Sequence, residues 1–253
     1  MPFLYMSKRD INDILHFRSD ISPFLVHLTR TFEPIDAKKR LRRIIDSRTL
    51  VAGNSLVSHA TYGYRIGSLD AEAKRKLFSA ICFTETPLSE MHCVLEIAGR
   101  EVDLAPYGLV FLKDRMVKRG VSPVLYLNNT QGDKDAVVRG LDRLIDTNRE
   151  VAEAILPLVA VFGKQLQSVY SNVPPNKEID FRWEREWRYP ASAGDFEFTE
   201  EDVFVGLCPH EEIDDFESRW QGIKFIDPTR SVKWYSSKLI AARHRLDIKY
   251  SVV

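Results

Sequence analysis

The chain has 253 residues, of which 44% are hydrophobic and 11% aromatic, an ordinary globular composition that can supply a sizeable core. Lysine plus arginine and aspartate plus glutamate each number 36, so the formal net charge is zero. This balance excludes a globally basic nucleic-acid binder, and a polyanionic partner would need a local patch.

The cysteines and the hydropathy of the chain give further expectations. Cys82, Cys93 and Cys208 are odd in number and have no paired spacing, which predicts no disulfide framework and suits a reducing compartment. His92 lies beside Cys93, but no second pair follows at ligand spacing, so we expect no metal site. The apolar run at the start is too short for a signal peptide, and no stretch approaches the roughly 20 apolar residues of a membrane span. We therefore expect a soluble, cytoplasmic protein with no membrane association.

The first half of the chain predicts short helices and strands around one long loop. In order, we expect a helix at 8–18, a strand at 24–30, a helix from its cap Asp36 to about Ser47, a loop or lid at 51–76, a strand at 78–84 and a helix at 88–97. The second helix contains Lys38-Lys39-Arg40-Leu41-Arg42-Arg43, with five cations in six residues. This run is typical of the solvated face of an amphipathic helix, and the alternative is a surface for a nucleic-acid acceptor.

The second half continues the alternation. We expect strands at 107–112 and 123–127 around a basic helix ending at Gly120, a long helical stretch at 133–168 broken near Pro157, strands at 203–207 and 223–226 around a helix at 210–220, and a C-terminal helix from about Thr229. Several connections are too short for a doubly wound parallel sheet. The prediction is an α+β fold in a single domain, residues 1–253, with a mixed or antiparallel central sheet and residues 133–168 as an insertion packed on the same core.

Polar residues interrupt three of these strands. His27 and Thr29 share a strand face with Arg30 beside them, and they are either satisfied core residues or ligand contacts. Glu85 follows a buried strand between two threonines, where it is either part of a helix N-cap or a functional carboxylate. Tyr107, like Tyr126 in the next strand, is either a core residue or a stacking platform for an aromatic ring.

The run Arg182-Trp183-Glu184-Arg185-Glu186-Trp187-Arg188-Tyr189 is the most informative segment. Its aromatic residues and Pro190 favour a strand, which places Glu184 and Glu186 on one face with Arg182 and Arg188. A helix is the alternative, because arginine and glutamate also recur at four-residue spacing. The carboxylates are then either a self-neutralised charge ladder on an exposed face or functional groups.

The order of these motifs resembles abortive phage resistance proteins of the AbiGi type. The motifs are, in order, the His-x-Thr strand, the Phe-Thr-Glu-x-Pro-Leu turn, Tyr-Gly-Leu-Val-Phe, Pro-Val-Leu-Tyr and Glu-x-Glu-Trp-Arg. The resemblance covers most of residues 24–190. The resemblance implies a role in phage defence. One form of that role is a non-enzymatic antitoxin or regulatory partner of a toxin.

More remotely, the layout is similar to the ADP-ribosyltransferase fold of DarT-like toxins, although the arginine-bearing loop of those toxins has no counterpart here. That resemblance implies NAD as substrate and a nucleic-acid or protein acceptor. His27 and Thr29 would hold NAD with Arg30 nearby, and Tyr64 or Tyr107 would stack on nicotinamide. Glu186 would be the catalytic carboxylate, stabilising positive charge on the ribose carbon, with Glu184 as its structural companion. Glu184 remains the alternative functional carboxylate.

Overall fold

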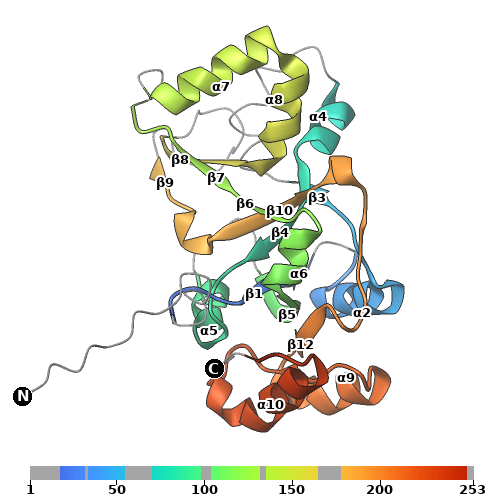
Figure 1. Ribbon diagram of the computed structural model, residues 1–253. Helices are drawn as coiled ribbons and strands as arrows, with labels where there is room; N and C mark the ends of the chain where they lie inside the picture. Colours follow the sequence, from blue (N-terminus) through green and yellow to red (C-terminus); the bar gives the residue numbers. More distant parts are fainter. Residues whose placement is uncertain are drawn as a thin grey trace, which may run out of the picture.

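A computed structural model of the chain describes residues 18–31, 34–54, 70–97, 104–131, 135–164 and 178–249 (Figure 1). Its central feature is an eight-stranded sheet in the order β13-β12-β5-β1-β4-β10-β6, with β3 paired to β4. The strands are β1 (Phe24–Arg30), β3 (Gly53–Asn54), β4 (Ser79–Thr84), β5 (Leu104–Leu112), β6 (Ser122–Pro123), β10 (Glu186–Pro190), β12 (Val203–Leu207) and β13 (Phe225–Ile226). Within this large sheet, β12 and β13 pair in parallel and the other described pairs are antiparallel, so the expected mixed α/β composition and mostly antiparallel central sheet are confirmed.

The helices cover this sheet and lie at both ends of the molecule. They are α2 (Ala37–Ser47), α4 (Ala71–Leu77), α5 (Met91–Leu95), α6 (Lys113–Lys118), α7 (Ala136–Thr147), α8 (Arg149–Ile155), α9 (Ile213–Arg219) and α10 (Ser236–Arg245). In Figure 1, α7 and α8 lie at the top, α9 and α10 at the bottom, and the large sheet between them. The main core joins the central strands to α2, α5, α6, α9 and α10.

Helix α2 forms as its sequence predicts. The carboxylate of Asp36 accepts a hydrogen bond from the Lys39 N–H at 2.7 Å, which satisfies a free donor of the first turn. Leu41 and Ile45 are buried one turn apart and face the sheet. The helix ends at Arg48, which adopts a left-handed conformation with φ 53°.

Residues 125–131, 135–164 and 178–179 form an inserted unit with its own sheet. Strands β7 (Leu125–Asn128), β8 (Val159–Lys164) and β9 (Glu178–Ile179) pair in that order. A further two-stranded sheet, β2 (Thr49–Leu50) with β11 (Phe196–Glu197), is not part of this unit. Helices α7 and α8 pack on β7 and β8 in a separate hydrophobic cluster that includes Phe78 and Leu156. The insertion therefore has a hydrophobic cluster of its own beside the main one, and its membership of a single domain with the rest of the chain stays a prediction.

The predicted helix at 133–168 is corrected. It breaks at Asn148, whose side chain caps α8 by accepting a hydrogen bond from the Val151 N–H at 3.3 Å. Pro157 lies in a 3-10 turn (Leu156–Leu158), and the β-branched residues after it form β8. Similarly, part of the expected loop at 51–76 is helix α4, capped by Asp70. The helix predicted at 8–18 lies almost wholly outside the described residues.

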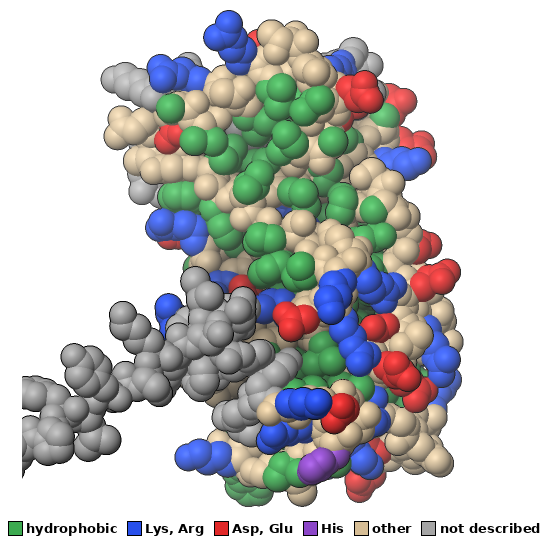
Figure 2. Space-filling view, viewed as in Figure 1, with side chains coloured by type: hydrophobic (Ala, Val, Ile, Leu, Met, Phe, Trp, Pro, Cys, Tyr) green, Lys and Arg blue, Asp and Glu red, His purple; other side chains and the backbone are tan. Residues whose placement is uncertain are grey.

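The surface mixes charges with apolar side chains. On the face shown in Figure 2, hydrophobic side chains gather over the upper half, whereas Lys, Arg, Asp and Glu intermingle over the lower half. Leu125, Val137 and Val151 of the inserted unit are each more than 40% exposed. Within the described ranges, no helix combines the length and the apolar character that crossing a membrane requires.

Candidate functional site

The charged run at 182–189 divides into a turn and a strand. Residues Arg182–Glu184 form a 3-10 turn, and Arg185 then adopts a left-handed conformation with φ 46° and ψ 52°. Strand β10 begins only at Glu186. The prediction of one strand through the whole run is therefore wrong for its first half. The alternative of one α-helix through the run is wrong as well, because the second half is a strand. Glu184 consequently does not share a strand face with Glu186.

Glu186 and Arg188 form a two-point ion pair. The Nε of Arg188 donates to Oε1 of Glu186 at 2.9 Å, and its Nη2 donates to Oε2 at 2.8 Å. The side chains are 13% and 2% exposed, so the pair is not a ladder on an open face. Burial by itself would lower the pKa of Arg188, but the neighbouring Glu186 carboxylate outweighs it and the pKa is raised. Both carboxylate oxygens of Glu186 are thus held by a permanently charged guanidinium.

The same arginine joins the large sheet to the inserted unit. Its Nη1 donates to the carbonyl oxygens of Pro157 and Val159, both at 2.9 Å. The hydroxyl of Tyr126 accepts the backbone N–H of Glu186 at 2.7 Å, and burial raises the pKa of Tyr126 to about 12. Tyr126 is therefore a structural contact of β10, and Arg188 connects β10 to the start of β8.

Glu85 lies in a second buried network. Its Oε1 accepts from Lys113 Nζ at 2.8 Å, and its Oε2 accepts from Trp187 Nε1 at 2.9 Å. The Arg185 guanidinium lies 3.8 Å from Oε1, and the Glu85 N–H donates to the Arg185 carbonyl at 3.1 Å. The left-handed turn at Arg185 thus brings both its carbonyl and its guanidinium to Glu85.

The helix-cap interpretation of the Thr84-Glu85-Thr86 turn is wrong. The 3-10 turn that follows begins after Pro87 and has no side-chain cap. Thr84 instead donates its hydroxyl to the Glu184 carbonyl at 2.6 Å. The sequence indicated this network only through Glu85, a carboxylate directly after a buried strand. Nothing in the sequence indicated that Lys113 and Trp187 would contact Glu85.

His27 lies where β1 and β4 meet. Its Nδ1 is 2.9 Å from the carbonyl oxygen of Cys82, and its ring packs edge-on against Phe83 with centroids 5.7 Å apart. Burial lowers the pKa of His27, more than the Cys82 carbonyl raises it. The imidazole is therefore neutral near pH 7, donates from Nδ1 to the carbonyl and leaves Nε2 as an acceptor.

Thr29 and Tyr107 are engaged by neighbouring elements. The Thr29 hydroxyl lies 3.0 Å from the Ala37 carbonyl and 3.2 Å from the Tyr107 carbonyl, which fixes the start of α2 to the sheet. The Tyr107 hydroxyl donates to Glu212 at 3.2 Å. Arg30 closes β1 opposite Leu104. Tyr64 lies outside the described residues.

The register of the sheet separates the predicted site residues. Val26 lies opposite Thr84, and Thr84 lies opposite Glu186. Residues directly opposite share a face, and neighbours along a strand point to opposite faces. His27 consequently points away from the face that carries Glu186. In this arrangement, His27 and Glu186 do not line one cleft, and the catalytic and NAD-binding roles stay predictions.

The basic run of α2 is largely paired. Lys38 contacts Glu212 at 3.0 Å, Arg42 contacts Asp215, and Lys39 contacts its own cap Asp36 at 3.2 Å. These pairs join α2 to α9 and to its own first turn. The run is therefore used for contacts within the chain, and a nucleic-acid acceptor would meet a partly neutralised surface.

Possible metal ligands gather at one place among the described residues. Carboxylate, imidazole and thiol groups of Glu90, His92 and Cys93 lie within 4.8 Å of one another. All three come from one short segment, whereas structural zinc sites have four ligands, commonly from two separated pairs. We assign no metal to this cluster.

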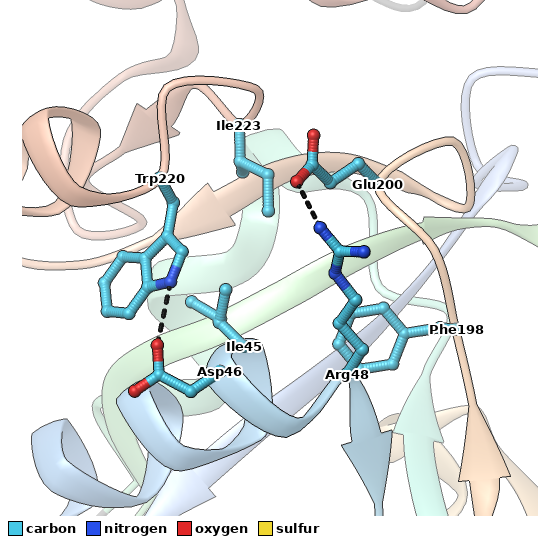
Figure 3. Close-up of a pocket in the computed structure, with 7 residues that line it drawn as sticks. All are labelled: Ile45, Asp46, Arg48, Phe198, Glu200, Trp220 and Ile223. Carbon is cyan, nitrogen blue, oxygen red and sulfur yellow. Dashed lines mark hydrogen bonds and ion pairs between the residues drawn. The ribbon is translucent and has the colours of Figure 1, made fainter.

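One surface pocket of about 330 Å³ is lined by none of the predicted site residues (Figure 3). It lies between the end of α2, the segment after β11 and the segment after α9. Its lining residues are Ile45, Asp46, Arg48, Phe198, Glu200, Trp220 and Ile223. Sequence reasoning missed it because these residues are far apart in the chain and no motif connects them.

The fold and these networks define a mixed α/β protein with a mostly antiparallel central sheet, in which Glu186 and Glu85 are paired with cations of the same chain. Comparison with protein families then identifies the family. The chain belongs to the family described as "Putative abortive phage resistance protein AbiGi, antitoxin", which matches residues 58–207. The membership expected from the order of motifs is confirmed. No curated protein matches, and no solved structure matches either, so the ADP-ribosyltransferase-like architecture stays a prediction.

Proposed function

We propose that this protein is the antitoxin of an abortive phage resistance pair and neutralises a partner toxin without catalysing a reaction. The family description carries this proposal. The contacts of two carboxylates support it, because buried Glu85 and largely buried Glu186 each have both oxygens engaged by groups of the same chain. A carboxylate that stabilises a developing cation needs a face open to substrate.

The exposed apolar side chains are consistent with a protein partner. Leu125, Val137 and Val151 belong to one inserted unit, and hydrophobic side chains gather on the upper half of the face in Figure 2. Apolar patches of this kind occur at protein–protein contacts.

The test is co-expression with the product of the neighbouring gene. The neighbouring product alone should stop growth, and growth should return when this protein is present. The two proteins should also co-purify. A neighbouring product that is harmless alone, or equally toxic with and without this protein, would contradict the proposal.

NAD-dependent ADP-ribosyl transfer remains the competing prediction and has a separate assay. The protein is incubated with labelled NAD and with DNA, RNA or protein acceptors, beside Glu186→Ala. Because that substitution also removes the partner of buried Arg188, circular dichroism must first show that the variant is folded. Label transfer or nicotinamide release by the wild type and not by a folded variant would favour the enzyme.

A further inference from the structure

The pocket in Figure 3 has apolar walls and a polar group on each side. Ile45 and Ile223 lie between the two sides, with Trp220 beside Asp46 and Phe198 beside Arg48. Trp220 is fixed by tilted contacts with Phe216, at a centroid distance of 5.3 Å, and with Phe225 at 6.5 Å. The pocket therefore offers a held indole ring next to carboxylates.

Guanidinium groups of the chain already occupy both polar sides. On one side, Arg219 lies 5.0 Å from the centre of the Trp220 ring and 2.8 Å from Asp46, which also accepts the indole N–H at 3.1 Å. On the other side, Arg48 donates to Glu200 at 2.9 Å. A carboxylate with an aromatic face is the combination that favours a planar, delocalised cation.

These internal pairs are easy to exchange. The side chains of Arg48 and Glu200 are 58% and 46% exposed, and those of Arg219 and Asp46 are 53% and 44% exposed. Exposed pairs of this kind contribute little to stability, so an incoming guanidinium can take the place of the pocket's own arginines at little cost. The two carboxylates, Asp46 and Glu200, are balanced by the guanidinium groups of Arg219 and Arg48, so an incoming arginine would take the place of a guanidinium and add no new charge type to the pocket.

The backbone of the pocket is preformed. The Phe198 N–H donates to the Arg48 carbonyl at 2.9 Å, the Arg48 N–H to Ile45 at 3.3 Å, and the Ile223 N–H to Trp220 at 3.0 Å. Gly222 leaves the space that Glu200 uses, because a Cβ there would lie 2.0 Å from Oε2 of Glu200. These hydrogen bonds hold the backbone around the pocket in place.

We propose that this pocket binds an arginine side chain presented by a partner protein, with Glu200 and Asp46 as acceptors and Trp220 as the stacking face. That the partner is a toxin rests on the proposed function, whereas the preference for guanidinium rests on the pocket alone. Lysine fits less well, because its ammonium group is compact and strongly hydrated and makes neither a two-point contact nor a planar stack.

The preference can be measured on the whole protein with short peptides. The chain has four tryptophans, so its ¹⁵N spectrum should contain four indole signals, and Trp220→Phe identifies the one in the pocket. The peptide Gly-Arg-Gly should shift the Trp220 signal in a saturable manner, and Gly-Lys-Gly should shift it much less. No shift, or equal shifts with both peptides, would overturn the proposal.

Variants separate binding from general charge effects. Glu200→Gln should weaken peptide binding about tenfold, as expected for the loss of one charge-assisted hydrogen bond. Glu201→Gln makes the same charge change at the next, exposed residue outside the pocket and should leave binding unchanged. Arg48→Ala removes the internal competitor and should strengthen binding. Equal effects of Glu200→Gln and Glu201→Gln would show that only net charge matters.

The co-expression assay tells the two proposals apart. If wild type rescues growth and Glu200→Gln with Trp220→Ala does not, the pocket contacts the toxin. If both rescue equally, the antitoxin function stands and the pocket's role in it is wrong. If wild type fails to rescue, the antitoxin function is wrong, and the peptide titration still decides whether the pocket binds arginine.

Discussion

Arg188 is buried, and its guanidinium contacts one carboxylate and two backbone carbonyls. The substitution Arg188→Met leaves the Glu186 carboxylate, which is only 13% exposed, without this partner. Breaking such a pair by removing one member lowers the free energy of unfolding by about 3 to 5 kcal/mol. Urea unfolding followed by tryptophan fluorescence measures the loss. Arg48→Met is the matched control, because its exposed pair is worth only about 0 to 1 kcal/mol.

Glu85 and Lys113 allow a sharper test, because both side chains are almost fully buried, at 11% and 7% exposed. Glu85→Gln and Lys113→Met should each destabilise the fold by about 3 kcal/mol or more, since each removes the nearest charged partner of a buried ionised group. The double variant should lose clearly less than the sum of the two. Strict additivity in urea unfolding would show that the two groups do not act as a pair.

His27 gives a pH dependence with a defined sign. Burial holds its pKa in the folded protein below the ordinary value of 6.5, so the unfolded chain binds the proton more readily. The stability associated with neutral His27 is complete above pH 6.5 and is lost as the pH falls through that value toward the lower folded pKa. His27→Gln should flatten the loss of stability between pH 7 and 5. An NMR titration that places the His27 pKa above 6.5 would contradict the argument.

At the scale of elements, regular segments could be predicted and irregular ones could not. The strand Phe24–Arg30, the helix capped by Asp36 and the strand Val203–Leu207 follow from local hydrophobic pattern and capping chemistry. Strand β10 starts later than predicted because the backbone of Arg185 adopts a left-handed conformation. Glycine is the residue that usually marks such a conformation in a sequence, so an arginine at this position did not predict it. Likewise, the apolar run after Pro157 is compatible with a helix or with a buried strand. It forms the strand β8 because it pairs with β7, a long-range contact that the local sequence does not show.

The candidate site was harder to predict because its contacts are long-range. The sequence placed Glu186 beside Arg188, but whether the pair faced solvent or the inserted unit depended on the Pro157 and Val159 carbonyls. Glu85 meets Lys113, 28 positions away, and Trp187, 102 positions away. Such partners are set by the order of strands in the sheet, which local patterns do not encode.

Helix α8 depends on a cap that sequence periodicity did not reveal. Asn148 ends α7 and accepts a hydrogen bond from the Val151 N–H, which starts α8. Asn148→Ala should lower the stability by about 1 kcal/mol, the usual value of an N-cap. Asp146→Ala, at the exposed end of α7, is the matched control and should be neutral or slightly stabilising, because it removes a negative charge from a helix C-terminus. The comparison uses urea midpoints of the two variants.

At the scale of the whole molecule, two hydrophobic clusters meet at β10. The larger cluster joins the central sheet to helices such as α2 and α10, and the smaller one joins α7 and α8 to β7 and β8. Arg188 and Tyr126 are polar contacts between the two parts. A junction held by few contacts opens more easily than either cluster. The division of the chain into one domain or two therefore becomes a question of cooperativity.

Native-state hydrogen exchange answers that question. In Arg188→Met, the amides of α7, α8 and β8 should exchange faster by a larger factor than those of β1 and β5, because the substitution removes a contact that holds the inserted unit to β10. In Glu85→Gln, the faster amides should lie in β4, α6 and β10, where the partners of Glu85 lie. If Arg188→Met instead accelerates exchange equally in both clusters, the two parts unfold as one unit. The single-domain prediction would then hold, and Arg188 would stabilise the whole fold rather than one junction.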